Sequence, residues 1–459
     1  MYQAINTHFK QQDSADQLRL SEILGAFTYA LDLTEGQPAG HSIRACWIGT
    51  QLGMALGMKG DELRDVYYAT LLKDLGCSSN AARVSEMFVG DDRKLKHDFK
   101  LIGPRPEDFG EHVVSAVGVT AAADARNQAL GNIAENGDAI MTEIIGTRCE
   151  RGADIARQLR FSENVAQAIA HLDEHWDGGG LPLGIAGTDI HIGGRIALLA
   201  QVVDVFFTAH GKDAAIAEVR SRSGSWLDPK LCLLFEKLSA ASGFWEELKL
   251  DDLPEQLFAL EPAVQYIPVD EDYLDDISLA FGRVIDAKSP YTAGHSERVG
   301  LLADKIAEKL GMDDDRRRAL RRAAILHDVG KLGVSSEILE KPGKLDAEEW
   351  EAMQRHAVYT TDILGRIGVM SDMAMISGSH HERLDGKGYP LGLDERSIAM
   401  ETRIITVADI YDALTMDRSY RSAMPSEKAM AILQGEVGKA VDRQCFEALQ
   451  NIIQQVELH

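Results

Sequence analysis

The chain of 459 residues is poor in cysteine, and it lacks a long apolar run. Its five cysteines, an odd number, are widely spread and form no CxxC pair, which argues against a disulfide framework and favours reduced, buried thiols. No stretch of about eighteen consecutive apolar residues occurs, so no membrane span is expected. The first residues show no basic segment followed by an apolar run, so no signal peptide is expected either. Together these absences predict a cytoplasmic protein.

Basic residues are also scarce. The 48 lysines and arginines face 72 aspartates and glutamates, which leaves a formal net charge of −24. A protein that wraps a nucleic-acid polymer needs a basic face, so no such partner is expected. A small anionic substrate remains compatible with this balance, because metal ions and a few arginines can supply local positive charge.

Strand signals are weak throughout, and only 12 prolines interrupt the chain. Residues 297–310 carry apolar side chains at helical spacing, and residues 403–414 form another apolar-rich helical segment. Asp346 followed by Glu349 is typical of a capping box at a helix start. These patterns predict an all-α fold.

The length favours two domains, since a chain of 459 residues exceeds one typical domain. Residues 246–276 are rich in acidic residues and proline, and no long amphipathic pattern crosses them. We therefore expect a first domain over residues 1–264 and a second over residues 265–459.

The two halves repeat one another. The sequence GHSIR at residues 40–44 returns as GHSER at residues 294–298, at an offset of 254 residues. At the same offset, LLKDLG at residues 71–76 returns as ILHDVG at residues 325–330. Several matches at one offset indicate a duplicated domain.

Further along, the offset changes. The Glu, Asp-Gly, Gly and Pro positions of residues 174–182 return in residues 382–390 at an offset of 208. The difference between 254 and 208 predicts an insertion of 46 residues in the first copy, around residues 77–140.

The second copy carries the chemistry. Its run from His380 to Pro390 begins with adjacent histidines and continues as a glycine-rich loop with a tyrosine, and a second pair precedes it at His327 and Asp328. Nitrogen and carboxylate donors without cysteine suit Mn, Fe, Zn or Ni. Seven donors are too many for one ion that also holds a water, whereas two ions sharing a carboxylate could clamp a phosphodiester. The candidate ligands are His295, His327, Asp328, His356, His380, His381 and Asp409.

These residues resemble the HD-GYP family, a branch of the HD phosphohydrolases that cleaves cyclic dinucleotides. The resemblance covers about residues 275–440, and implies two tandem HD-type helical domains of which the first is degenerate. It also implies that Asp328 bridges two metal ions. The first ion would be held by His295, His327 and Asp409, and the second by His356, His380 and His381.

The resemblance assigns further residues. Lys331 would act with Asp328 in catalysis, by contacting the scissile phosphate or a bridging hydroxide. Family members with three metals carry a glutamate where this chain has Tyr291, so two ions are expected. Substrate would be bound by Gly386, Lys387, Gly388 and Tyr389 on the base side, and by Arg418 and Arg421 at the phosphates.

Other polar residues have plainer interpretations. For Asp412, solvation on its helix or a hydrogen bond to a metal ligand is expected, rather than metal binding. The basic cluster before His327 predicts a solvated helix face, with steering of an anionic substrate as the alternative. That cluster comprises Arg316, Arg317, Arg318, Arg321 and Arg322.

The first copy has lost most of the ligand set. It keeps His41 and Asp74, whereas the remaining positions read Lys73, Arg148, Leu172, Asp173 and Gln201. Two donors are too few to hold a metal. An internal ion pair between Lys73 and Asp74 is therefore predicted in the emptied cavity. His171 and His175 flank the degenerate motif but lack further partners, so no metal is expected there.

The resemblance implies a metal-dependent phosphodiesterase that opens a bacterial 3′,5′-cyclic dinucleotide to a linear dinucleotide, with further cleavage to mononucleotides left open. Cyclic di-GMP is the default substrate, and 3′,3′-cGAMP is the rival. The alternatives are a non-catalytic sensor of cyclic dinucleotides and an HD nucleotidase of another specificity. The first copy is expected to regulate or pack against the second, and a homodimer or a signalling protein partner stays open.

Overall fold

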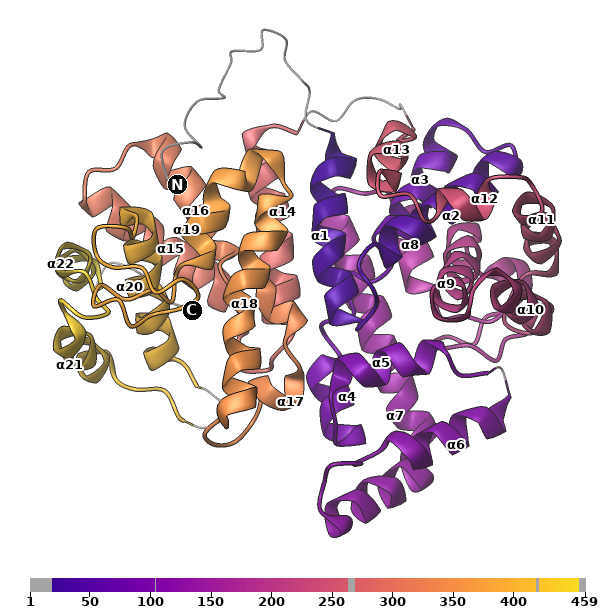
Figure 1. Cartoon of the computed structure of the whole chain (residues 1–459), viewed down its shortest axis with the longest axis horizontal. Helices are drawn as coiled ribbons and strands as arrows, with labels where there is room; N and C mark the ends of the chain where they lie inside the picture. Colours follow the sequence, from indigo (N-terminus) through magenta and orange to yellow (C-terminus); the bar gives the residue numbers. More distant parts are fainter. Residues whose placement is uncertain (1–18, 104, 263–268, 418–420, 454–459) are drawn as a thin grey trace, which may run out of the picture.

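The structure, a computed structural model, describes residues 19–103, 105–262, 269–417 and 421–453. Across these residues it contains α-helices, three short 3-10 helices and isolated bridges, but no extended strand. The all-α prediction is therefore confirmed. Figure 1 shows two helical halves side by side, with the first half in indigo to magenta and the second in orange to yellow.

The first half is built from thirteen described α-helices. They are α1 (Leu20–Thr34), α2 (His41–Ala55), α3 (Gly60–Leu71), α4 (Ala81–Phe88), α5 (Asp92–Lys100), α6 (Pro106–Ala116), α7 (Ala123–Gln158), α8 (Glu163–Ala170), α9 (Ile192–His210), α10 (Lys212–Arg222), α11 (Pro229–Ser239), α12 (Phe244–Glu247) and α13 (Leu253–Ala259), with η1 (Gly187–Asp189) before α9.

The second half has nine described α-helices. They are α14 (Glu271–Asp286), α15 (His295–Lys309), α16 (Asp314–Ile325), α17 (Ser336–Leu339), α18 (Ala347–Gly365), α19 (Ser371–Gly378), α20 (Met400–Thr415), α21 (Ser426–Glu436) and α22 (Arg443–Ile452), with η2 (Val329–Gly333) and η3 (Gly368–Met370) between them. The helices expected at residues 297–310 and 403–414 correspond to α15 and α20. The capping box at the start of α18 forms as expected, with Asp346 and Glu349 bonded reciprocally.

The duplication is visible in the helix bounds. Helices α2 and α15 begin and end 254 residues apart, and so do α3 and α16. Helices α8 and α19 are separated by 208 residues, the second offset found in the sequence. The domain boundary expected between residues 264 and 265 falls in residues 263–268, outside the described residues.

Matched turns place a histidine at the start of α2 and of α15. Gly40 and Gly294 precede these helices with φ of 84° and 71°, a left-handed conformation that favours glycine. The hydroxyl of Ser296, the next residue after His295, donates to Asp286 at 2.7 Å. In the first copy the equivalent serine donates to Asp32, also at 2.7 Å. The same local design therefore fixes His41 and His295.

The two halves share one apolar core, which includes residues from α1, α14, η2 and α18. At its centre Phe27 of α1 stacks on Phe281 of α14, with ring centroids 3.8 Å apart and an interplanar angle of 11°. A buried ion pair also crosses between the halves, with Lys288 Nζ 2.7 Å from Asp92 Oδ2 and side chains 2% and 0% exposed. Figure 1 shows α1 and α18 facing each other along this boundary.

The stretch in which the insertion is expected contains α4, α5, α6 and the first part of α7. These helices have a small core of their own, formed by residues such as Val84, Phe88, Val117 and Ile140. Figure 1 places this group at the lower side of the first half. The extent of the insertion stays a prediction.

Helix α9 is long and apolar enough to cross a membrane by length and composition alone. However, 78% of its apolar window is buried inside the structure. Its packing against the other helices of the first half is that of a buried core helix. All five cysteines are free and buried, as the sequence indicated.

Candidate active site

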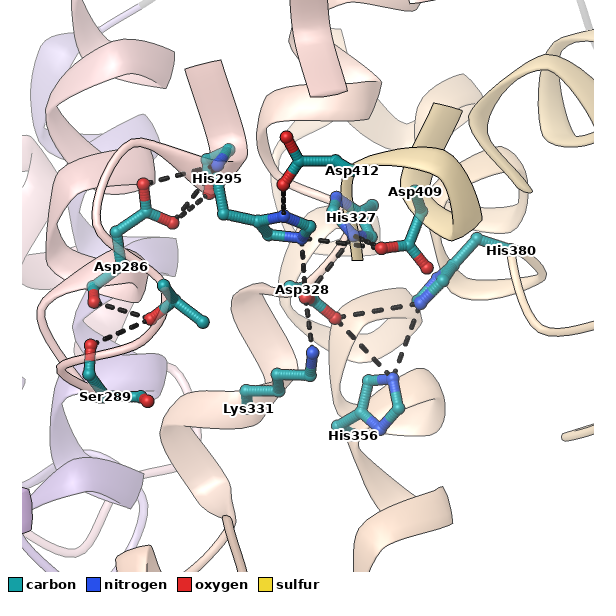
Figure 2. A network of polar contacts seen from close by, with 12 residues as sticks. Asp286, Ser289, His295, His327, Asp328, Lys331, His356, His380, Asp409 and Asp412 are labelled. Atoms are coloured by element: carbon teal, nitrogen blue, oxygen red, sulfur yellow. Dashed lines mark hydrogen bonds and ion pairs between the residues drawn. The ribbon is translucent and has the colours of Figure 1, made fainter. Parts of the chain in front are cut away.

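Asp328 lies at the centre of the histidine cluster in the second half. Its Oδ2 is 3.3 Å from His327 Nε2 and 3.6 Å from His295 Nε2. Its other oxygen, Oδ1, is 3.7 Å from the Nε2 atoms of both His356 and His380. Figure 2 shows the four rings and the carboxylate converging on one point. Asp328 thus presents one oxygen to each of two neighbouring sets of donors.

The two sets differ in chemistry. One contains His295, His327 and Asp409, and the other contains His356, His380 and His381. Within each set, the ligand atoms lie within 4.8 Å of one another. His380 also groups with His327 and Asp328, so the sets are contiguous. All seven residues expected to bind metal are therefore brought together, across α15, the start of η2, α18, the end of α19 and α20.

Backbone contacts orient the rings. The Nδ1 atoms of His327, His356 and His380 bond to carbonyl oxygens three residues earlier, at 2.7, 2.6 and 2.5 Å. A neutral imidazole that donates from Nδ1 keeps its lone pair on Nε2. Each ring therefore directs its Nε2 atom at the centre, which is the arrangement usual for histidine ligands.

The donor set fits divalent metal ions. Three atoms at the centre, His295 Nε2, His327 Nε2 and Asp328 Oδ1, are buried and have no hydrogen-bond partner among the described residues. Leaving buried polar atoms unsatisfied costs stability, and a bound cation would satisfy all three. Mixed imidazole and carboxylate donors suit first-row transition metals, although they do not single out one of them.

Charge is divided unequally between the two sets. Burial alone lowers the pKa of His327, but the facing carboxylates of Asp328 and Asp409 outweigh it and raise the pKa to about 10. Burial lowers the pKa of His356 to about 4, because only Asp328 opposes it strongly. The carboxylates of Asp328 and Asp409 therefore act mainly on the first set, whereas the second set consists of imidazoles alone.

Asp412 contacts a candidate ligand, which is one of the two roles expected for it from the sequence. Its Oδ2 lies 2.6 Å from His295 Nδ1, while its Oδ1 accepts a 2.6 Å hydrogen bond from Arg298 Nε. This pair of contacts fixes the orientation of the His295 ring. The first half repeats the arrangement with Asp204, which lies 2.6 Å from His41 Nδ1 and accepts from Arg44.

The Asp412→Asn change should therefore weaken metal binding by about 10–100-fold, the usual effect of losing a residue that orients a metal ligand. Titration calorimetry with Mn²⁺ on the full chain measures this affinity. Asp204→Asn is the matched control, since it alters the same contact in the half without the ligand set. Equal Mn²⁺ affinity in both variants and in the parent protein would show that Asp412 does not support the site.

Lys331 lies beside the central carboxylate. Its Nζ donates to Asp328 Oδ2 at 2.6 Å, and its side chain is 23% exposed. The residue belongs to η2, the short helix that follows Asp328 directly. The structure therefore places a partly exposed ammonium group at the edge of the donor cluster, where a phosphate oxygen could approach.

The loop after His381 is held by features that the sequence did not assign. Glu382 accepts hydrogen bonds from the backbone N–H groups of Leu391, Gly392 and Leu393. A Cβ on Gly388 would lie 2.4–2.6 Å from backbone atoms of residues 381–383, so only glycine fits. The conserved spacing between glutamate and glycine within the two copies was the available signal for this structural role.

Tyr389 faces the metal donors. Its ring centroid lies 4.7 Å from that of His381, and 5.8 Å from that of Trp350. Gly386 has a φ of 72°, and the backbone N–H of Lys387 donates to Asp385. The loop thus presents an aromatic wall beside the cluster.

Arg421, expected to bind a substrate phosphate, is engaged in other contacts. The guanidinium of Arg421 donates to the backbone oxygens of Ala413 and Leu414, in the last turn of α20. Arg418 lies outside the described residues.

Most of the arginine cluster before His327 pairs with acidic side chains, and Arg322 is buried against Asp275. The prediction of a fully solvated helix face was therefore too simple.

In the first half, basic side chains occupy the matching space. Lys73 forms the expected ion pair with Asp74, and its Nζ also lies 2.9 Å from His41 Nε2. Glu35, Asp74 and Cys77 lie close enough together to suggest a metal group. However, Lys100 Nζ approaches Glu35 at 2.8 Å and Asp74 at 3.6 Å, so ammonium groups already balance these carboxylates.

The other degenerate positions are also satisfied by protein contacts. Arg148 pairs with Asp173, the residues that stand opposite His356 and His381. His171 accepts a hydrogen bond from the backbone N–H of His191, and His175 stacks on Trp226. The described structure therefore gives these two histidines roles other than metal binding.

The all-α fold and the cluster of histidine and aspartate donors agree with the family that the sequence matches. The sequence matches the HD domain family over residues 128–231 and 280–445, one match in each half. The chain belongs to the HD domain family and, within it, to the HD-GYP branch.

Relatives with assigned activities are similar over different lengths. The chain is 48% identical to the 3′3′-cGAMP-specific phosphodiesterase 3 of Vibrio cholerae, over 95% of this chain and 94% of that protein. It is 37% identical to a cyclic di-GMP phosphodiesterase of Thermotoga maritima, over 43% of this chain and 55% of that protein. A crystal structure of a cyclic GMP-AMP specific phosphodiesterase from V. cholerae aligns with a TM-score of 0.65 and 45% identity, over 96% of this chain and 99% of that one.

Proposed function

We propose that this protein is a metal-dependent phosphodiesterase that hydrolyses 3′,3′-cGAMP in its second half. The observation that carries this proposal is the position of Asp328, with one oxygen toward each of two sets of buried donors. Similarity over both halves to a 3′3′-cGAMP-specific enzyme supports the choice of substrate. The similarity to the cyclic di-GMP enzyme covers less than half of this chain, so it supports that default substrate less strongly.

Two divalent ions would be held, one by each donor set, with Asp328 between the sets. His295, His327 and Asp409 would hold one ion, and His356, His380 and His381 would hold the other. When bound, such a pair supplies Lewis acidity and an activated water for attack on phosphorus. The seven donors include only two carboxylates, Asp328 and Asp409, so they would leave part of the charge of two divalent ions uncompensated, which favours binding of a phosphodiester anion.

The protein's own groups would complete the reaction. Lys331, at the edge of the cluster, is placed to contact a phosphate oxygen or to donate a proton to the departing 3′-oxygen. Tyr389 would stack on a base, while Gly386, Lys387 and Gly388 shape that side of the site. Arg418 and Arg421 would contact the substrate phosphates. For Arg421 this requires giving up its contacts with the end of α20.

The product is a linear dinucleotide, and a second cut would give mononucleotides. A non-catalytic sensor is less well supported, because a sensor has no need of seven converging donors. The first half has lost most of these donors, whereas the second half keeps all seven. An HD nucleotidase of another specificity would not need the loop at residues 380–390. We also propose a cytoplasmic location in a bacterial cell, with a homodimer or signalling protein as partner.

Removal of metal tests this function. After treatment with EDTA and desalting, the full chain should retain its helical circular dichroism but lose turnover of 3′,3′-cGAMP. Mn²⁺ or Fe²⁺ should restore turnover, with about two ions bound per chain by elemental analysis. Undiminished turnover in protein shown to be free of metal would contradict the proposal.

A further inference from the structure

A cavity of about 630 Å³ lies in the first half, beside positions that match part of the donor set of the second half. Arg148, Asp173 and Gln201 line it, and these positions match His356, His381 and Asp409 at the 208-residue offset. Lys73 fills the space beside His41 and Asp74, whereas the space beside Arg148, Asp173 and Gln201 stays open. Its volume is within the usual range for small-molecule sites.

Apolar and aromatic side chains form much of the cavity wall. On one side Trp226 stacks on His175, with ring centroids 4.1 Å apart and an interplanar angle of 17°. The stretch where the insertion is expected supplies other wall residues, namely Val84, Phe88, Phe99 and Phe109. Flat aromatic surfaces of this kind suit a planar ring in the ligand.

Basic groups also line the cavity. Five lysines and arginines face three acidic residues there, in a chain whose overall charge is −24. Lys96 and Lys100 project from α5, and Lys100 Nζ lies 2.8 Å from Glu35. All five are ion-paired, but Lys96, Lys100 and the neighbouring Lys73 share only two carboxylates, those of Glu35 and Asp74. The excess of positive charge on this side of the cavity favours an anionic ligand.

Two buried amides point to hydrogen-bond donors on the ligand. Asn80 is 4% exposed and Gln201 is 7% exposed, and both line the cavity. The amide nitrogen of Asn80 donates to the backbone oxygen of Ile144 at 3.2 Å, which leaves its Oδ1 without a partner. Gln201 Oε1 also has no hydrogen-bond partner among the described residues. Buried acceptors of this kind are normally satisfied.

We propose that this cavity is a second binding site of the protein, specific for a nucleotide. A phosphate would be held on the side of Lys96, Lys100 and Arg148. The base would lie along the aromatic wall, and its amino or ring N–H groups would donate to Asn80 and Gln201. The site goes beyond the proposed phosphodiesterase reaction and does not depend on it.

Helix α5 connects this cavity with the active site. Lys96 and Lys100 line the cavity, whereas Arg93 of the same helix donates to the backbone oxygen of Gly333 in η2. Asp92 accepts from the backbone N–H of Ser336 at 2.7 Å. Because η2 also carries Lys331, an occupant that shifts α5 acts on the segment beside Asp328. The proposed site therefore gives the first half a regulatory role.

Calorimetric titration of the full chain in EDTA tests the proposal, since turnover requires metal. GMP, AMP and 3′,3′-cGAMP are the probes, each titrated separately. We expect at least one of them to bind. Ile145→Trp should fill the cavity, and Lys100→Met should remove a cation, so each should weaken this binding by at least about tenfold. Lys94→Met is the matched control, because Lys94 is exposed on α5 and lies outside the cavity.

Circular dichroism establishes that each variant is folded, and Trp226→Ala replaces either pocket variant if that one unfolds. Binding that is weakened by both pocket variants and kept by Lys94→Met supports the site. The proposal is overturned if none of the three probes binds, or if binding survives either folded pocket variant unchanged. His381→Ala separates the two sites, because it alters the active site and leaves the cavity intact.

Discussion

Replacing Asp328 by alanine should abolish cyclic-dinucleotide turnover, with kcat lower by at least roughly a thousandfold. The change removes a carboxylate whose two oxygens face both donor sets, at 3.3–3.7 Å from four histidine nitrogens. Loss of metal-centred charge stabilisation costs several kcal/mol of activation free energy, and each ~1.4 kcal/mol is a factor of ten. Neither ion would then share a ligand with the other.

Two measurements separate this effect from misfolding. Elemental analysis of the Asp328→Ala variant should show fewer than two ions per chain, while its far-UV circular dichroism should match that of the parent protein. His381→Ala provides a milder comparison, since it removes one donor from one set only. An Asp328→Ala variant that keeps both ions and turns over within tenfold of the parent rate would rule out the bridging role.

The Asp92→Ala change should lower the free energy of unfolding by about 3–5 kcal/mol, because it leaves the buried Lys288 ammonium without its partner. Burial already lowers the pKa of Lys288, although Asp92 opposes this shift. The backbone N–H of Ser336 would lose its acceptor as well. Urea unfolding, followed by circular dichroism, measures the loss.

A double variant identifies the cause. In Asp92→Asn/Lys288→Met, the amide oxygen can still accept from Ser336 and no buried charge remains, so most of the stability should return. Unfolding of the Asp92→Ala variant within about 1 kcal/mol of the parent protein would contradict a role for this pair in joining the halves.

Much of the fold could be predicted because the chain contains two copies of one domain, which can be aligned with each other. Matching GHSIR with GHSER aligned α2 with α15, and the periodic segments then became helices as expected. The ion pair of Lys73 with Asp74 was also predictable, since a lysine beside a retained carboxylate in an emptied site has few other partners. Local pattern and internal repetition carried these predictions.

Contacts between distant segments could not be predicted in this way. Nothing in the periodicity of residues 20–34 indicates that Phe27 stacks on Phe281, or that Asp92 reaches Lys288 in the other half. The burial of Arg322 depends on where α14 places Asp275. The cavity in the first half depends on how the helices of residues 77–140 fold over it, and the alignment of the two copies ends at that stretch.

The site was predictable as a set of residues but not as a geometry. Ligand order along the chain identified the seven donors, whereas the opposite orientation of the two Asp328 oxygens depends on how η2 packs against α14 and α18. Glu382 was missed as a structural residue, although its recurrence as Glu174 was visible. Glu174 accepts backbone hydrogen bonds from Leu183 and Ile185 in the same way.

Turnover of separate cyclic dinucleotides by the Mn²⁺-loaded full chain tests the account most directly. With 3′,3′-cGAMP, cyclic di-GMP and cyclic di-AMP each supplied alone, product analysis by chromatography should show a linear dinucleotide, formed fastest from 3′,3′-cGAMP. Tight binding of one of these molecules without turnover of any would contradict the account and identify the protein as a sensor.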